Sequence, residues 1–125
     1  MKVLAIDYGT KRVGVAVSYA SLAQPLQIIA NDEYLLDNIS RLITQHHVDH
    51  LVVGLSENQM AVQTQAFVKR LQTITALPIT LVDETLTSYQ VHQWLREQPR
   101  GKRQGPIDHF AAAVILENYL SSLDA

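Results

Sequence analysis

Cysteine is absent from the 125 residues of this chain. Disulfide bridges, zinc–thiolate centres and thiol nucleophiles are therefore excluded. The apolar runs are short, and none approaches the roughly 20 residues that a membrane-spanning helix requires, so we expect no membrane span. The sequence begins without the pattern of a signal peptide, which leads us to expect a cytoplasmic protein.

Charged residues make up only 18% of the chain, with 10 Lys and Arg against 12 Asp and Glu, a net charge of −2 and a pI of about 6.2. A polyanionic partner must therefore be bound by a local basic patch and not by the whole surface. Hydrophobic residues make up 47%, without a low-complexity run or an internal repeat, which is typical of a globular protein. We expect one domain over residues 1–125.

The N-terminal stretch combines two apolar runs around a single acid. Val3–Ile6 has no polar alternation, which predicts a central strand covered on both faces. Asp7, the turn signal Tyr8–Thr10 and the run Val13–Val17 then complete a predicted β-hairpin. A carboxylate where burial ends requires a cation or hydrogen-bond donors. Two partners of Asp7 stay open, a divalent metal ion and the N–H groups of its own turn.

Pro25 predicts either an edge strand or a strand that starts after it, and we expect a third strand over Leu26–Ile29. Apolar residues at helical spacing predict an amphipathic helix over Tyr34–His47, with Asn31 or Asp32 as its N-cap.

The rest of the chain alternates predicted strands and helices, which favours a mixed sheet whose first strands are antiparallel and whose later ones are parallel. We expect a strand over Asp49–Gly54, followed by a polar loop. The next helix has the buried stripe Val62, Phe67, Val68 and Leu71 and ends near Ile74, and a strand over Ile79–Val82 follows it. Two further helices are expected, one carrying Val91, Trp94 and Leu95 and one from Ile107 to Leu123.

Acids stand at the ends of three predicted elements, at Asp7, at Asp83 and Glu84, and at Asp108. Sites in open sheets form beyond the strand ends, so these carboxylates can converge. Crowded carboxylates repel one another unless a cation compensates, and Mg²⁺ bound by carboxylates supports phosphodiester hydrolysis. Simpler roles stay open, because the helix dipole favours an acid at Asp108 and Glu84 suits a solvated turn.

At these residues the sequence resembles the YqgF/RuvX family. The matching motifs cover nearly the whole chain and run Asp7-Tyr8-Gly9-Thr10-Lys11-Arg12-Val13-Gly14-Val15-Ala16, Val52-Val53-Gly54-Leu55, Asp83-Glu84-Thr85-Leu86-Thr87-Ser88 and Ile107-Asp108 through Ala112 to Ile115-Leu116. The resemblance implies an RNase H-like α/β fold, with a mixed five-stranded sheet and helices on both faces. It also implies a nuclease that matures the 5′ end of pre-16S rRNA during ribosome biogenesis.

The same resemblance implies that Asp7, Glu84 and Asp108 are the catalytic residues and the ligands of Mg²⁺ or Mn²⁺. The family match is the sole reason for choosing Glu84 over Asp83, since strand alternation lets only one of the two point into a site. The resemblance further implies that this protein binds pre-rRNA or branched DNA, and ribosome precursors. A homodimer is left open.

Three departures from the family pattern concern these expectations. Thr85 stands where the family usually has arginine, and the loop after Leu55 is shorter and lacks the Pro-x-Asn-x-x-Gly pattern. Ala111 stands where a full junction resolvase has a fourth acid. The substrate contacts at position 85 and in that loop are therefore left open, and the chain is less like a full resolvase.

Basic residues gather just before the last predicted helix, at Arg100, Lys102 and Arg103. A basic loop next to Asp108 predicts contacts with backbone phosphates, although such loops are often only solvated. Lys11 and Arg12, within the first matching motif, are the other expected nucleic-acid contacts.

Other functional classes receive weaker support. The Gly-x4-Gly spacing from Gly9 to Gly14 is followed by Val15 and not by Lys, which excludes a P-loop. An actin-like ATPase role stays open, but such enzymes need a second phosphate loop that this chain lacks. A non-catalytic nucleic-acid or ribosome-binding module and a Holliday-junction resolvase are the further alternatives. His46, His47 and His50 lie across a predicted helix end and strand start, which favours a polar surface over a metal cluster.

Overall fold

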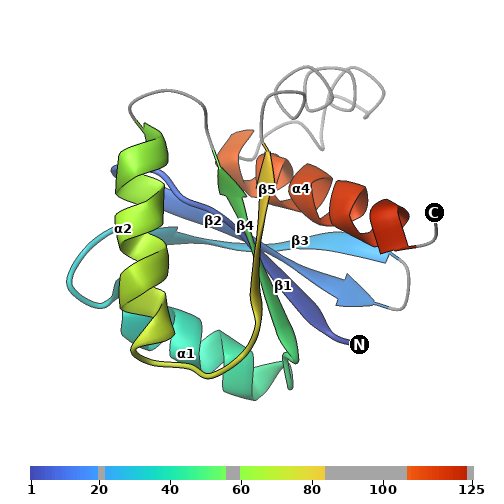
Figure 1. Ribbon diagram of the computed structural model, residues 1–125, viewed down its shortest axis with the longest axis horizontal. Coiled ribbons are helices and arrows are strands. Elements are labelled where there is room, and N and C mark those ends of the chain that lie inside the picture. Colours follow the sequence, from blue (N-terminus) through green and yellow to red (C-terminus); the bar gives the residue numbers. More distant parts are fainter. Residues whose placement is uncertain (20–21, 56–59, 84–106, 124–125) are drawn as a thin grey trace.

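The computed structural model describes residues 1–19, 22–55, 60–83 and 107–123. Its centre is a five-stranded sheet in the order β3-β2-β1-β4-β5 (Figure 1). The strands are β1 Val3–Asp7, β2 Arg12–Tyr19, β3 Leu22–Ala30, β4 His50–Leu55 and β5 Ile79–Asp83. The first three pair antiparallel, whereas β1 pairs parallel with β4 and β4 with β5. The predicted mixed sheet is confirmed.

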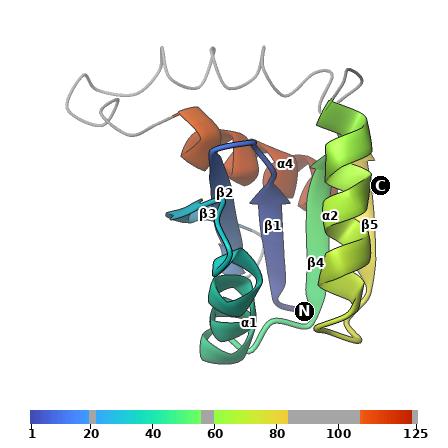
Figure 2. The same ribbon diagram turned by 90° about the vertical axis from the view of Figure 1, so that its left-hand side faces the viewer.

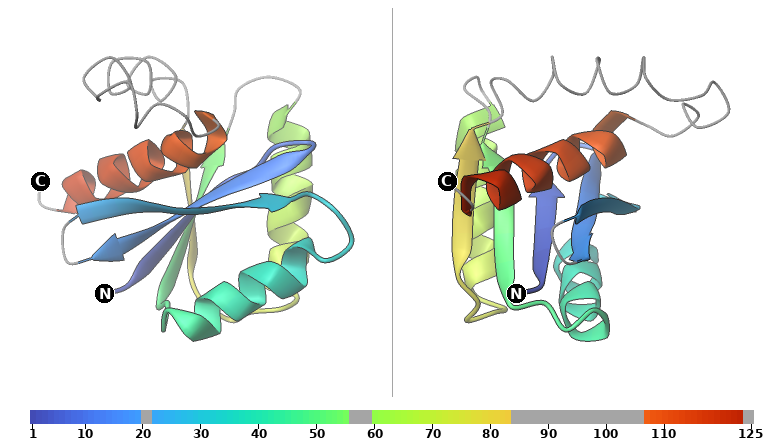
Figure 3. Two further views of the ribbon diagram at one scale, coloured as in Figure 1. Left: turned by 180° about the vertical axis from the view of Figure 1, so that it is seen from behind. Right: turned by 90° about the vertical axis from the view of Figure 1, so that its right-hand side faces the viewer.

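Helices cover both faces of this sheet. Helices α1 (Leu35–Gln45) and α2 (Met60–Gln72) lie on one face (Figure 2), and α4 (Ile107–Leu123) crosses the other (Figure 3). In the described part of the chain, no helix has the length and apolar character to cross a membrane. The helix expected around Trp94 lies outside the described residues.

Strand β1 occupies the middle of the sheet, as its unbroken apolar run predicts. All four side chains from Val3 to Ile6 are fully buried. Leu4 and Ile6 belong to the core cluster under α1 and α2, together with Phe67 of α2. Burial on both faces fixes the register of β1, because a slip by one residue would exchange its two sets of side chains.

The face under α4 is lined by small residues. Ala5 and Ala16 of the sheet meet Ala112 and Ala113 of α4, and all four are buried. Small side chains on both surfaces let a helix pack close to a sheet. This arrangement agrees with the alanine-rich stripe of the last predicted helix.

The third strand differs from the prediction, since it begins at Leu22 and not at Leu26. Pro25 lies inside it, which the sheet tolerates because β3 is an edge strand. Residue pairing also shifts near Pro25, where its partner is Ala16 while Gln27 pairs with Val15. The prediction stopped at the proline because a β-bulge cannot be recognised from local composition.

Two expectations about the helices were wrong. Residue Tyr34 is the N-cap of α1 and makes no capping bond with its side chain, while Asp32 accepts a hydrogen bond from the N–H of Tyr34 at 2.9 Å. Asn31 instead bonds to the turn after β1. On α2, Val62 is 74% exposed and does not belong to the buried stripe, whereas Phe67 does.

Candidate functional site

Strands β1, β4 and β5 run parallel and end at the same edge of the sheet, here called the upper edge. Ile6 pairs with Val53, and Gly54 on the same strand pairs with Val82 of β5. Helices α2 and α4 both begin at this edge, which lies at the top of Figures 1 and 2. Ligand-binding sites of open α/β sheets typically form at this edge, beyond the carboxyl ends of the parallel strands.

Asp7 is the last residue of β1 and is half-buried at the upper edge. Val3 and Ala5 pack under α4, so the period of two assigns Asp7 to the same face. Its partner on β2 is Gly14, and the residue after Val53 on β4 is Gly54. Each of the two strands next to β1 therefore has a buried glycine beside Asp7. Glycine has no side chain, so neither position adds one beside the carboxylate.

The turn after Asp7 is tightly built. A Cβ atom at Gly9 would lie 2.5 Å from the carbonyl oxygen of Arg12, so only glycine is accommodated there without a backbone shift. Asn31, which directly follows β3, stabilises the turn through two hydrogen bonds. Its side-chain amide donates to the carbonyl oxygen of Gly9 at 2.7 Å, and its backbone N–H donates to the carbonyl oxygen of Lys11 at 3.0 Å. Sequence analysis missed this role of Asn31, since no local signal marks a contact 22 residues away.

The predicted site residues are described to different extents. Asp7 has the predicted position at the end of the central strand, and Lys11 and Arg12 are exposed in the adjoining turn and at the start of β2. Asp108 belongs to the first turn of α4, but its side chain is outside the description. Residues outside the described ranges are Glu84, Arg100, Lys102 and Arg103.

His46, His47 and His50 lie near the start of β4, away from the upper edge. Within the ranges that the structure describes, no three His, Asp or Glu side chains form a group that could bind a metal ion. His50 is half-buried, and the expected polar surface is wrong for it. Its Nε2 lies 2.7 Å from Oγ1 of Thr80, and its ring stacks on Tyr119 of α4 at a centroid distance of 5.4 Å. This contact joins α4 to β4 away from the upper edge.

Solved structures share this fold. Thermus thermophilus RuvC in complex with a Holliday junction substrate superimposes with a TM-score of 0.68 at 13% identity, covering 100% of this chain and 96% of that one. The fowlpox virus Holliday junction resolvase gives a TM-score of 0.61 at 12% identity, covering 98% and 99%. These likenesses establish the expected RNase H-like fold.

Sequence comparison extends the likeness from the fold to the family. The model of the RuvX family, described as Holliday junction resolvase, matches residues 1–122. Two relatives named "Putative pre-16S rRNA nuclease", from Streptococcus uberis and Streptococcus mutans, are 38% and 37% identical, covering 96% and 98% of this chain and 97% and 99% of theirs. The chain therefore belongs to the RuvX family.

Proposed function

We propose that this protein is a metal-dependent nuclease that hydrolyses phosphodiester bonds in the 5′-end maturation of pre-16S rRNA. The observation that carries the proposal is the half-buried Asp7 between two buried glycines at the upper edge. A carboxylate at the end of a buried strand suits a divalent ion, which binds oxygen ligands and keeps part of its water shell. The name of the streptococcal relatives, which match over nearly their whole length, supplies the RNA substrate. Such a role belongs in the cytoplasm.

The second acid of the proposed site is Glu84. Val82 packs with the cluster under α4, on the face to which alternation assigns Asp7. Glu84 follows Val82 by two positions, so a period of two favours Glu84 over Asp83 for that face. The alternation of β5 and the family resemblance therefore favour the same acid.

The third acid is Asp108, in the first turn of α4. Ala112 and Ile115 follow it by four and seven residues and are both fully buried against the sheet. Helical spacing assigns position 108 to that same stripe. Because α4 begins at the upper edge, an acid of this stripe is a suitable third ligand.

The donor set of Asp7, Glu84 and Asp108 consists of carboxylates, the ligands that Mg²⁺ and Mn²⁺ prefer. A bound ion of this type would activate water and stabilise the leaving oxygen during hydrolysis. The protein would contribute the three carboxylates and the space next to Asp7. Lys11 and Arg12, exposed beside this site, would contact backbone phosphates, as would Arg100, Lys102 and Arg103.

A second candidate is a nuclease that acts on branched DNA, favoured by the resemblance of the fold to RuvC and the fowlpox resolvase. The third is a module that binds nucleic acid or ribosome precursors without cleaving them, which would retain Asp7 for the turn alone. All three share the basic residues near the upper edge, so cleavage and substrate choice discriminate among them.

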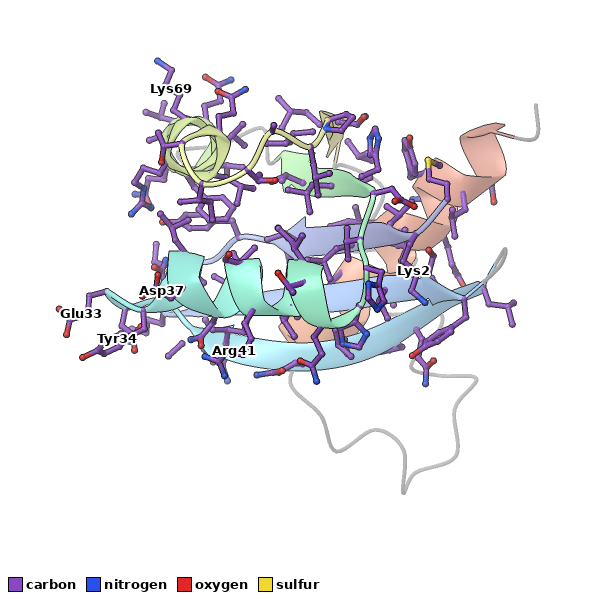
Figure 4. The ribbon with its side chains drawn as sticks, turned by 90° about the horizontal axis from the view of Figure 1, so that it is seen from below. Lys2, Glu33, Tyr34, Asp37, Arg41 and Lys69 are labelled. Atoms are coloured by element: carbon purple, nitrogen blue, oxygen red, sulfur yellow. The ribbon has the colours of Figure 1, made fainter. Side chains whose placement is uncertain are left out.

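The test is incubation of the protein with labelled pre-16S rRNA fragments and with four-way DNA junctions, in Mg²⁺, in Mn²⁺ and in a chelator. We expect cleavage of the RNA that the chelator abolishes. Asp7→Asn should remove cleavage while the protein stays folded, since it loses a ligand and a repelling charge together. Asp37→Asn is the matched control, because Asp37 is an exposed acid of α1 (Figure 4).

Other outcomes point elsewhere. Full cleavage by pure Asp7→Asn would contradict the proposed site. Cleavage of junctions alone would favour the second candidate, and binding without cleavage would favour the module. ATP hydrolysis in the absence of nucleic acid would favour a kinase-like phosphate site instead.

A further inference from the structure

The turn that follows Asp7 is anchored to helix α2 by an aromatic pair. The rings of Tyr8 and Phe67 stack at a centroid distance of 4.5 Å with 19° between their planes. Phe67 is fully buried in the cluster under α1 and α2, and Tyr8 packs against that cluster half-buried. The Tyr8 ring therefore rests on a side chain that the core holds in place.

Arg70 fixes the outer end of the same ring. Its guanidinium donates to the Tyr8 hydroxyl at 3.3 Å and lies 6.0 Å from the centre of the Phe67 ring. Arg70 comes one helical turn after Phe67, so a single face of α2 supplies both contacts. Phe67 and Arg70 are 59 and 62 residues away from Tyr8 in the sequence, so no local sequence pattern predicts these contacts.

Tyr8 and Asp7 are adjacent in the chain but belong to opposite sides of the sheet. The Tyr8 ring lies on the side of α2, while the alternation of β1 assigns Asp7 to the side of α4. The planar peptide group between them limits how far the two residues can turn independently. Holding the ring on α2 therefore restrains the backbone from which the Asp7 side chain leaves.

We propose that Tyr8 is a positioning residue for Asp7, which it orients toward the metal ion by anchoring the end of β1 to Phe67 and Arg70. This inference rests on the proposed function, because it assumes that Asp7 is a metal ligand. Residues that hydrogen-bond directly to a metal ligand typically change metal affinity or activity by about 10-fold to 100-fold when they are removed, and an anchor acting through the backbone should fall at the lower end. The stacked ring is the main anchor, and the hydroxyl contact with Arg70 is an addition to it.

The experiment compares wild type with Tyr8→Leu and Tyr8→Phe. Mn²⁺ affinity is measured by titration calorimetry, and kcat and KM are measured on a pre-16S rRNA fragment. For Tyr8→Leu we expect Mn²⁺ affinity and kcat each to fall about 10-fold, with an unchanged KM. Tyr8→Phe should retain both within about threefold, because it keeps the stack on Phe67 and loses only the hydroxyl.

Leu71→Ala is the matched control for general loosening of the core. Leu71 is fully buried in the same cluster and on the same helix, but it carries neither of the contacts to Tyr8. It should lower the unfolding temperature and leave Mn²⁺ affinity unchanged at temperatures where the variant is folded. An equal loss of Mn²⁺ affinity in Leu71→Ala and Tyr8→Leu would overturn the positioning role.

The wild-type measurements separate this inference from the proposed function. A wild type that neither binds Mn²⁺ nor cleaves RNA would overturn both. A wild type that does both, with a Tyr8→Leu variant of equal affinity and kcat, would overturn the positioning role alone.

If Tyr8→Leu does not fold, Asn31→Ala loosens the same turn by removing the bond to Gly9, and its Mn²⁺ affinity should fall about threefold. Unchanged affinity in that variant would count against the role.

Discussion

Asp7 of β1 lies directly opposite Gly14 of β2 in the antiparallel pair. Any larger residue at position 14 would place its side chain beside the Asp7 carboxylate, on the face covered by α4. The glycine costs strand stability, since it has no side chain to pack and loses more conformational freedom on folding. A glycine that is unfavourable for the strand but adds no side chain beside a half-buried acid agrees with the proposed role of Asp7 as a metal ligand.

Gly14→Val should therefore keep the fold and lose the site. Valine favours a strand but adds volume under the closely packed α4, so we expect the free energy of unfolding to fall by about 1–3 kcal/mol. The added isopropyl group should fill the space next to Asp7 and lower Mn²⁺ affinity and cleavage at least about 10-fold. Urea denaturation, calorimetry and the RNA cleavage assay measure these three quantities. Wild-type cleavage by a folded Gly14→Val protein would show that the metal ion does not use this space.

Gly9→Ala tests the tightness of the turn on its own. The new Cβ would meet the carbonyl oxygen of Arg12, which is backbone and cannot move without distorting the start of β2. We expect a loss of about 1–3 kcal/mol of unfolding free energy. Ser40→Ala, at an exposed position of α1, should change it by less than about 0.5 kcal/mol. Equal stability of the two variants in urea would mean that the turn relaxes freely.

The sheet could be predicted from the sequence because its signals are local. Val3–Ile6 lacks polar alternation, and that run proved to be the central strand with both faces covered. Ile79–Val82 and the last helix were likewise recognised from apolar spacing and from Pro78. The errors arose where distant partners decide, as with Pro25 inside an edge strand and with Val62 on the exposed side of α2.

Only part of the candidate site could be predicted from local sequence signals. Asp7 could be singled out because an acid directly follows a buried strand. The stack of Tyr8 on Phe67 and the bond from Asn31 to Gly9 could not, because they depend on how the elements pack.

The choice between the two acids after β5 can be tested directly. Because alternation from Val82 favours position 84 for the face of Asp7, Glu84→Gln should abolish RNA cleavage and weaken Mn²⁺ binding at least about 10-fold. Asp83→Asn should retain both within about threefold. The pair is its own control, since each variant removes one negative charge at adjacent positions. The opposite result would mean that Asp83 is the ligand and that the strand alternation is interrupted before position 84.

The basic segment before α4 is expected to bind backbone phosphates, and a double variant tests this. Lys102→Ala with Arg103→Ala should weaken binding to RNA and DNA fragments alike, because phosphate contacts carry little sequence information. Each lost contact lowers the slope of log affinity against log salt by about 0.7 to 0.9, so two contacts should flatten it by about 1.4 to 1.8. Mn²⁺ affinity should not change, since neither residue is a proposed ligand.

The control must remove two positive charges elsewhere. Arg41 of α1 and Lys69 of α2 are both exposed, and neither lies in the basic segment (Figure 4). Because the double variant Arg41→Ala with Lys69→Ala has the same net charge as the test protein, any difference in slope reports local contacts and not overall charge. Binding is measured from low to physiological salt for all three proteins. Equal slopes and equal affinities in the test and control variants would mean that Lys102 and Arg103 belong to a solvated connector.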